Sequence, residues 1–401
     1  MSQIDNLIRE LCPNGVDHKS LGEVGEFIRG SGLQKADLRE QGVPAVHYGQ
    51  IHTHYSVWAT ETKSFTDVSL AAKLRRAKTG DLLIATTSED DEAVAKATAW
   101  LGEADVVLSG DACIYRHALE PKYMAYFFHS TMFHDQKRRF ISGTKVRRVS
   151  GASLAKIRIP VPPLEVQRET VRILDQFTQL EAELEAELEA RRAQYEYYRK
   201  EFLTFGKDVP LRRLDEIATY VNGKAHEKLV VEGAAIPLVT ARFISRNGEA
   251  NRYVPFEDVR TPGRVGDIAL VLSDLPNGRA LARTFFVDRD DSYAINQRVA
   301  RIRVNDPSVV TPKFLHYVLD RNRGLLRHDN GVDQTHLSKA QVTGLMVPMP
   351  PHKVQERLVE LIDRFDDLVN DISIGLPAEL NARRKQYEHY RDRLLTFKEL
   401  V

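Results

Sequence analysis

The most regular hydrophobic pattern in the chain lies at residues 164–205, a segment without Gly or Pro. Its apolar positions recur mostly every three or four residues, which is the spacing of one face of an α-helix. They are Ile173, Phe177, Leu180, Leu184, Leu188, Tyr195, Tyr198, Phe202 and Phe205. At about 1.5 Å per residue, the segment predicts a helix roughly 60 Å long. The apolar face of such a helix needs a partner.

The same pattern returns near the end of the sequence, so the chain contains an internal repeat. Residues 191–205 and 383–397 are identical at ten of fifteen positions, with an offset of 192. The second copy is the obvious partner, and we predict that the two long helices pair as an antiparallel coiled coil. Because Gly375 and Pro377 lie inside the second copy, that helix should kink or break there.

The segments that precede the two helices share a frame but differ in content. Residues 80–84 correspond to 266–270, and each run predicts a strand leaving a tight turn. Pro121 and Pro312 also correspond, and each predicts the start of a helix. We therefore expect an α+β fold, with two pseudo-symmetric α/β domains alternating with the two long helices. The predicted boundaries are 1–20 for an N-terminal connecting segment, 21–160 and 209–349 for the two domains, and 161–208 and 350–401 for the two helical spacers.

Charge is balanced over the whole chain but not along it. The 401 residues hold 57 Lys and Arg against 56 Asp and Glu. Residues 121–160 carry nine basic side chains and one acid, and residues 279–303 carry six Arg and three Asp. Residues 164–190, on the first helix, carry eight acids and two Arg. Two basic domains on an acidic spacer fit a clamp on a phosphate backbone.

Other features narrow the class of protein. No run of about 18 apolar residues predicts a membrane span, and the first residues lack the pattern of a secretory signal. Two cysteines cannot form a disulfide framework. A cytoplasmic protein is the expectation that follows.

Motifs for catalysis are missing from the sequence. It contains no phosphate-binding Gly-x-x-x-x-Gly-Lys-Ser/Thr loop, no Gly-x-Gly-x-x-Gly and no Asn-Pro-Pro-aromatic tetrad of amino-methyltransferases. The acidic run Glu89–Glu92 fits a solvated loop better than a metal site. His47, His52 and His54 have only a weak metal-ligand spacing. We expect a non-catalytic chain without a metal.

Three motifs resemble the specificity subunit of type I restriction-modification systems, the HsdS-like proteins. Residues 157–167 read Ile-x-Ile-Pro-x-Pro-Pro-x-x-x-Gln, and residues 184–199 approach Leu-x-Ala-Glu-Leu-x-Ala-Arg-Arg-x-Gln-Tyr-x-x-Tyr-Arg. The opening Leu-Cys-Pro-Asn-Gly-Val at residues 11–16, followed by Leu-Gly-Glu at 21–23, is also typical. The resemblance covers essentially the whole chain, and the repeats make it specific.

The resemblance implies a non-enzymatic reader of double-stranded DNA. Each recognition domain (21–160 and 209–349) would read one half of a bipartite asymmetric site, and the paired helices would set the spacer between the halves. Two methyltransferase subunits carrying S-adenosylmethionine would dock on the helices and recognition domains. Two restriction subunits that use ATP and Mg²⁺ would join for cleavage. No cofactor is expected on this chain itself.

Phosphate contacts would position each domain, and a few polar side chains would read base edges. The first candidates follow Gly143 and Gly331 in corresponding loops. They are Lys145, Arg147 and Arg148 in the first domain and Gln334 and His336 in the second. Second choices, just past strand-like runs, are Arg29, Ser31, Thr87, Ser88 and Arg279. Candidates for partner binding are Tyr195, Tyr198, Tyr387 and Tyr390, although tyrosines at such positions are more often core.

Two other classes of function stay open on the residues alone. One is a coiled-coil scaffold whose basic domains bind an acidic protein rather than DNA. The other is a self-contained DNA methyltransferase or nuclease with an unrecognised site. Methylation assays with and without co-expressed partner subunits discriminate them, because the enzyme reading requires activity from this chain alone.

Insertion of one Leu-Glu-Ala-Glu unit into the first helix should lengthen the spacer of the recognised DNA site. Four residues add about 6 Å of helix, which is close to two base pairs at about 3.4 Å each. The second helix already carries four residues more than the first, because Leu180 to Arg191 spans 11 positions and Leu368 to Arg383 spans 15. Methylome sequencing measures the spacer, and an unchanged spacer would contradict this hypothesis.

Overall fold

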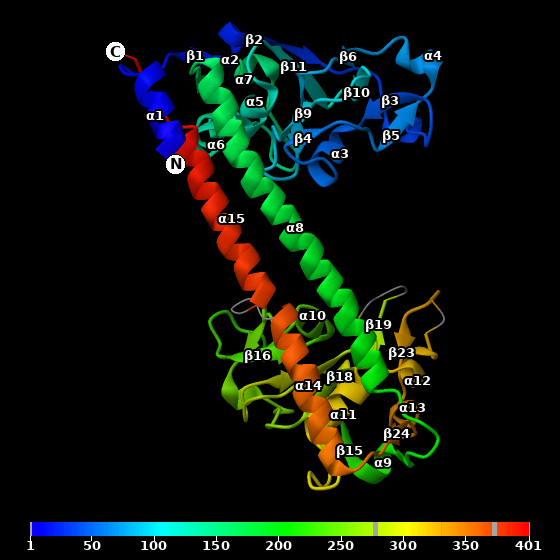
Figure 1. Cartoon of the computed structure of the whole chain (residues 1–401). Helices are drawn as coiled ribbons and strands as arrows, with labels where there is room; N and C mark the ends of the chain where they lie inside the picture. Colours follow the sequence, from blue (N-terminus) through cyan, green and yellow to red (C-terminus); the bar gives the residue numbers. More distant parts are fainter. Residues whose placement is uncertain (1, 276–279, 330, 371–374, 401) are drawn as a thin grey trace. The chain divides into compact units, whose positions relative to one another are not determined.

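The computed structural model describes residues 2–275, 280–329, 331–370 and 375–400. The chain forms two compact units (Figure 1). Unit 1 comprises Met1–Glu187 and Ala378–Val401, and unit 2 comprises Leu188–Pro377. The long helix α8 (Leu164–Phe202) begins in unit 1 and ends in unit 2. In the described part of the chain, no helix has the length and apolar character needed to cross a bilayer.

Unit 1 contains two main sheets and two small strand pairs. The five-stranded sheet has the order β2-β11-β7-β9-β4. Strands β4 and β9 are parallel, and every other pair of neighbouring strands in this sheet is antiparallel. The four-stranded sheet has the order β5-β3-β10-β6, with β3 and β10 parallel. The strands are β1 (His18–Ser20), β2 (Gly25–Arg29), β3 (Val43–Val46), β4 (Trp58–Ala59), β5 (Ser64–Thr66), β6 (Arg76–Ala77), β7 (Leu82–Ala85), β8 (Thr87–Ser88), β9 (Ala97–Trp100), β10 (Val106–Leu108), β11 (Ala112–His117), β12 (Arg147–Arg148) and β13 (Arg158–Pro160).

Unit 2 repeats this arrangement with fewer strands. Its larger sheet has the order β15-β22-β18-β20, and its smaller sheet has the order β17-β16-β21, with β16 and β21 parallel. The strands are β14 (Leu211–Arg213), β15 (Ala218–Asn222), β16 (Ile236–Val239), β17 (Tyr253–Val254), β18 (Ile268–Val271), β19 (Ser273–Asp274), β20 (Thr284–Phe286), β21 (Ala294–Ile295), β22 (Val299–Val304), β23 (Thr335–His336) and β24 (Met346–Pro348).

Short helices cover the sheets, and the long ones correspond to the predicted spacers. The predicted starts at Pro121 and Pro312 are confirmed, since each proline is the first residue of a helix. The α-helices besides α8 are α1 (Ser2–Leu11), α2 (Leu21–Val24), α3 (Tyr48–Thr53), α4 (Val68–Ala71), α5 (Pro121–Phe128), α6 (Thr131–Arg138), α7 (Gly151–Leu154), α9 (Leu214–Ile217), α10 (Ala241–Ser245), α11 (Pro312–Leu319), α12 (Arg323–Leu326), α13 (Lys339–Thr343), α14 (His352–Asn370) and α15 (Gly375–Leu394). The finer domain boundaries given above stay predictions.

The long helices pair in antiparallel fashion within each unit. In unit 1, Phe177 of α8 stacks on Tyr390 of α15 with ring centroids 5.3 Å apart. Further along α8, Glu181 and Glu185 both accept hydrogen bonds from Arg384, so α15 runs in the opposite direction. In unit 2, Tyr198 of α8 stacks on Phe365 of α14 at 6.0 Å. The predicted α+β architecture with an antiparallel helix pair is confirmed.

Over the described residues, the second spacer consists of α14 and α15. Gly375, the first residue of α15, has a φ of +66°, a left-handed conformation that does not occur inside a continuous right-handed helix. The expected break is therefore confirmed at this glycine. The four residues by which the second spacer exceeds the first fall somewhere between Leu368 and Arg383; positions 371–374 within this interval lie outside the described residues.

The predicted apolar stripe is interrupted rather than wrong throughout its centre, since Leu188, near the middle of α8, is only 7% exposed. Leu180 is 48% exposed and Leu368 is 56% exposed. Leu180 starts the four-residue repeat of α8, and steps of four drift around a helix relative to a coiled-coil seam. The helix α8 also ends at Phe202, so Phe205 lies beyond it.

Each long helix is joined to its domain by one carboxylate that binds the same two residue types. Asp175 of α8 accepts from Lys122 Nζ at 2.7 Å and from Tyr126 Oη at 2.8 Å. In unit 2, Asp363 of α14 accepts from Lys313 Nζ at 2.7 Å and from the hydroxyl of Tyr317. The lysine and the tyrosine come from successive turns of α5 or α11. We call these contacts the carboxylate anchors.

A buried glutamine adds a second repeated contact. Gln167 Oε1 accepts from the backbone N–H of Glu120 at 3.0 Å, and its Nε2 donates to the Pro162 carbonyl at 2.7 Å. Gln355 makes the equivalent bonds to Thr311 and Pro350. The glutamine of the Pro-Pro-x-x-x-Gln motif thus caps a domain helix and fixes the Pro-rich segment, which explains why both copies contain it.

Beyond these shared contacts, the two units secure their helices differently. In unit 2, Arg199 of α8 pairs with Asp320 at 2.8 Å, with side chains 15% and 11% exposed. The corresponding positions in unit 1 are Arg391 and His129, and the contact there is made by Asp392. This carboxylate accepts from the backbone N–H and the hydroxyl of Thr131 at 3.0 and 2.6 Å.

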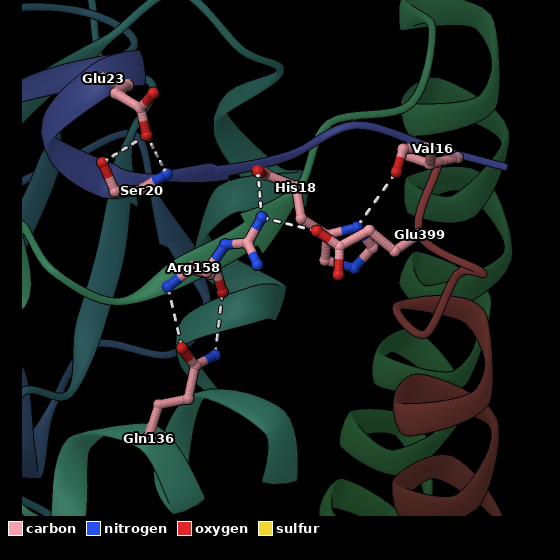
Figure 2. A network of polar contacts seen from close by, with 7 residues as sticks. All are labelled: Val16, His18, Ser20, Glu23, Gln136, Arg158 and Glu399. Carbon is pink, nitrogen blue, oxygen red and sulfur yellow. Dashed lines mark hydrogen bonds and ion pairs between the residues drawn. The ribbon is translucent and has the colours of Figure 1, made fainter. Parts of the chain in front are cut away.

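In unit 1, residues 398–400 pair with the segment after α1. Val16 N donates to Lys398 O at 2.8 Å, and Leu400 N donates to Val16 O at 3.0 Å. Arg158 Nη2 bonds to Glu399 at 2.6 Å and to the His18 carbonyl at 2.8 Å (Figure 2). The pair β1–β13 and the end of the chain are thereby held as one structure.

Substitution of Asp363 by Ala should lower the free energy of unfolding of unit 2 by about 1–3 kcal/mol, because it leaves the largely buried Tyr317 hydroxyl without its acceptor. Urea unfolding measures this change. The matched control is Asp367→Ala, which removes an exposed carboxylate from the same helix. Equal effects of the two substitutions would contradict the assigned role of the carboxylate anchor.

Candidate nucleic-acid interface

The leading candidates of unit 1 lie on two short strands that pair with each other. Strand β12 runs antiparallel to β8, with Arg147 opposite Ser88 and Arg148 opposite Thr87. The turn before β12 passes through Gly143, whose φ of +90° favours glycine. We call β8, β12 and this turn, residues 142–148 with Thr87 and Ser88, the unit 1 ribbon. Sequence-distant candidates are therefore brought together here.

The three basic side chains of the ribbon have different surroundings. Arg147 is 34% exposed; its Nε lies 2.8 Å from Asp91 Oδ1, and its Nη1 donates to the Gly143 carbonyl at 2.6 Å. This guanidinium therefore closes the turn on itself. Lys145 and Arg148 are exposed, so their charges are accessible to a phosphate backbone.

Unit 2 has a corresponding ribbon built from β19 and β23. Ser273 lies opposite His336, and Asp274 lies opposite Thr335. Gln334 Nε2 donates to Ser273 Oγ at 3.1 Å, and the turn before β23 contains Gly331 with a φ of +68°. We call β19 and β23, with Gly331 and Gln334, the unit 2 ribbon. It carries an imidazole, His336, where the unit 1 ribbon carries Arg148, and the amide of Gln334 lies two residues before it.

Two residues beside the unit 2 ribbon were missed by the sequence reasoning. A cleft of about 440 Å³ is lined by Ser273, Gln334 and His336 together with Gln297 and Arg298. The last two are exposed and form the turn between the buried strands β21 and β22. Their signal was available, since a polar pair between two apolar strand runs predicts an exposed turn. Arginine and glutamine are also side chains that contact phosphates and bases.

The second-choice candidates are spread over neighbouring positions. Arg29 ends β2, and its Nε donates to the Gly110 carbonyl at 3.2 Å. Thr87 Oγ1 lies 3.4 Å from Asp111 Oδ1, in the turn between β10 and β11 that corresponds to the Gln297 turn. Ser31 follows β2 and donates its backbone N–H to Leu108 O at 3.3 Å. Arg279 lies outside the described residues.

The weak metal candidates have other partners. His47 Nδ1 accepts from Gly49 N at 3.2 Å at the start of α3, and burial lowers the pKa of this histidine. His52 Nε2 lies 2.9 Å from the Thr87 carbonyl. The acidic run at 89–92 is exposed, as predicted for a solvated loop. Over the described ranges, no cluster of three or more His, Cys, Asp or Glu side chains could hold a metal ion.

The four tyrosines proposed for partner binding lie at the paired helix ends. Tyr195 is only 6% exposed, and Tyr387 is half-buried. Tyr198 and Tyr390 stack on aromatic rings of the opposite helix. Close to these tyrosines, two clefts occupy corresponding places. One of about 650 Å³ in unit 1 is lined by Glu388 and Arg391, and one of about 330 Å³ in unit 2 by Glu196 and Arg199.

Comparison with known proteins finds one family over most of the chain. Residues 13–190 and 207–382 match the family described as "Type I restriction modification DNA specificity domain". The Escherichia coli type I restriction enzyme EcoR124I/EcoR124II specificity subunit is 30% identical over 280 residues, which cover 66% of this chain and 66% of that subunit. The match therefore spans just under two thirds of that relative's length. A putative specificity subunit from Haemophilus influenzae is 28% identical over 64% of this chain and 68% of its own.

Solved structures agree on the fold. A chain from a structure on complex assembly and conformational transition of the type I R-M system has a TM-score of 0.67 and 15% identity, covering 96% of this chain and 98% of that chain. The type I restriction-modification S subunit of M. genitalium has a TM-score of 0.51 and 12% identity, covering 94% and 96% of the two chains. At these identities the likeness concerns the fold alone.

Substitution of Arg147 by Ala should loosen the unit 1 ribbon, whereas Lys145→Ala should not, because only Arg147 bridges Asp91 and Gly143. The backbone N–H groups of Ser142 and Arg148, which bond to each other's carbonyls at 2.9 Å, report on this. Their hydrogen exchange should accelerate by about tenfold in the Arg147 variant, corresponding to roughly 1.4 kcal/mol of lost local stability. Equal exchange in both variants would show that the guanidinium does not hold the turn.

Proposed function

The chain belongs to the type I restriction modification DNA specificity family, and from this we propose that it is the sequence-reading subunit of a type I restriction-modification complex. The domain of unit 1 reads one half of a bipartite, asymmetric DNA site, and the domain of unit 2 reads the other half. The chain itself is not catalytic. It determines which DNA sequence the catalytic subunits act on.

The observation that carries this proposal is a ribbon repeated at the same place with different side chains. In both units, the first strand of the ribbon follows a central strand of the larger sheet, β7 or β18. The second strand follows a turn with a left-handed glycine. Two domains that bind different DNA sequences need the same backbone arrangement with different side chains. Phosphate contacts position each domain, and base-edge contacts specify its target.

Under this proposal, the long helices contribute to sequence-specific methylation in two ways. They set the spacer between the half-sites, and they dock two methyltransferase subunits, with two restriction subunits joining for cleavage. The repeated clefts at Glu196 and Glu388 support docking of two identical subunits, since each lies at the same position of its repeat. The tyrosines then act by shaping the helix ends beside these clefts.

Cofactors belong to the partners in this proposal. S-adenosylmethionine is carried by the methyltransferase subunits, and ATP and Mg²⁺ by the restriction subunits. The chain's own contribution is DNA positioning, with the target base turned out of the duplex for the methyltransferase. Methylation of a bipartite site should therefore require this chain and the methyltransferase subunit together.

The test uses the full chain co-expressed with its methyltransferase subunits, followed by methylation mapping and DNA-binding measurements. The variant Gln334→Ala should relax base preference in one half-site only, because an amide can read a base edge. The variant Lys145→Ala should weaken binding to all sequences and reduce the slope of log K against log salt by about one.

The control for these variants is Lys19→Ala, which removes an exposed charge from β1, away from the ribbons. It should leave both the affinity and the salt slope unchanged. Methylation by this chain alone, or a complex that binds DNA without salt dependence and methylates no defined site, would overturn the proposed function.

A further inference from the structure

The loop that leaves the unit 1 ribbon ends in an unusual backbone conformation. Ala95 has a φ of +66°, and its side chain is fully buried. Its N–H donates to the carbonyl of Ala85, the last residue of β7, at 2.8 Å, so the loop from residue 86 to 94 is closed at its base. A non-glycine residue with positive φ is uncommon and persists only where its surroundings impose it.

Unit 2 has an alanine in the same conformation at the corresponding place. Ala282 has a φ of +57°, is fully buried, and donates its N–H to the carbonyl of Val271, the last residue of β18, at 3.1 Å. The two domains share little sequence, yet both have a left-handed alanine where the loop rejoins the larger sheet. The conformation therefore belongs to the common frame of the two domains.

In unit 1, a buried cation binds the backbone just before this turn. Lys137 of α6 is 1% exposed, and its Nζ donates to the carbonyls of Glu92 and Val94 at 2.6 and 2.7 Å. These two carbonyls belong to residues just before Ala95. Burial lowers the pKa of Lys137 to about 8, so keeping this ammonium inside the domain costs free energy. The two hydrogen bonds from this ammonium to the loop offset part of that cost and hold the loop in place.

The loop that contains Glu92 and Val94 also contacts the unit 1 ribbon. Asp91, one residue before Glu92, pairs with Arg147, and Arg147 lies opposite Ser88 in the ribbon. Contacts thus run without a gap from the ammonium of Lys137 through residues 91–94 to the turn that presents Lys145. Lys137 is only 1% exposed and lies at the wall of the unit 1 cleft near Glu388, not on the solvent-facing side of the ribbon.

We propose that Lys137 and Ala95 are positioning residues for target specificity: together they fix the unit 1 ribbon at the height and angle at which it reads its half-site. This inference rests on the proposed function and adds two residues that do not contact DNA. A change at either position should alter which sequence the first domain accepts, while the half-site read by unit 2 stays unchanged.

The experiment measures methylation of a library of sites by the full complex with its methyltransferase subunits. The variant Lys137→Met keeps the length of the side chain and removes its donors. Discrimination against single mismatches in one half-site should fall by about tenfold, the effect of one lost base-pair preference. Lys137→Arg, which keeps donors, should restore most of it, and Lys19→Met is the matched control on the surface.

A second variant guards against loss of folding. Ala95→Gly keeps the left-handed conformation but widens the range of backbone angles, so it should fold and still relax the same half-site. Ala282→Gly is its counterpart in unit 2 and should relax the other half-site, the one affected by Gln334→Ala. Each variant is checked for its thermal unfolding midpoint, so that specificity is compared between folded complexes.

Unchanged discrimination at both half-sites in the folded Lys137→Met and Ala95→Gly complexes would overturn the inference. Equal loss at both half-sites would also overturn it, because that result indicates a general defect. Failure of the proposed function is distinguishable, since the unmodified complex would then methylate no bipartite site at all.

Discussion

A carboxylate in each unit attaches the long helix to the domain that it carries, and the other helix–domain contacts add to this attachment. Asp175 and Asp363 each accept from a lysine and a tyrosine on successive turns of a domain helix. A helix sets a distance only between bodies that are attached to it at a fixed angle. Two donors of different type, bound to the two oxygens of one carboxylate, fix that angle better than apolar packing alone, because hydrogen bonds are directional.

Comparison of the two repeats distinguishes residues that maintain the fold from residues that differ between the two ribbons. The anchors, the glutamine contacts and the left-handed turns of the ribbons occur twice with the same residue types. The ribbons differ at the positions that face solvent, with Lys145 and Arg148 in one and Gln334 and His336 in the other. The two copies of the domain can therefore be compared like two related sequences. Residues that both copies share are those that the fold requires.

Much of the fold followed from local chemistry in the sequence. The helix starts at Pro121 and Pro312 and the break at Gly375 were predictable because each depends on one residue's backbone constraints. The exposure of Leu180 was not, since it depends on how a step of four drifts against a partner. The exposed turn at Arg298 was readable from the sequence, but its place beside the unit 2 ribbon was not, because only the folded sheet brings the two together.

The different contacts at Arg199 and Asp392 mean that the two domains would not be equivalent if they exchanged places in the chain. If the second domain moved to the first position, Asp320 would meet Arg391, and an ion pair could form again. If the first domain moved to the second position, His129 would take the place of Asp320, and the largely buried guanidinium of Arg199 would lose its carboxylate. Removing one partner of a buried pair costs about 3–5 kcal/mol. Exchange of the two domains within this chain is therefore less costly in one direction than in the other.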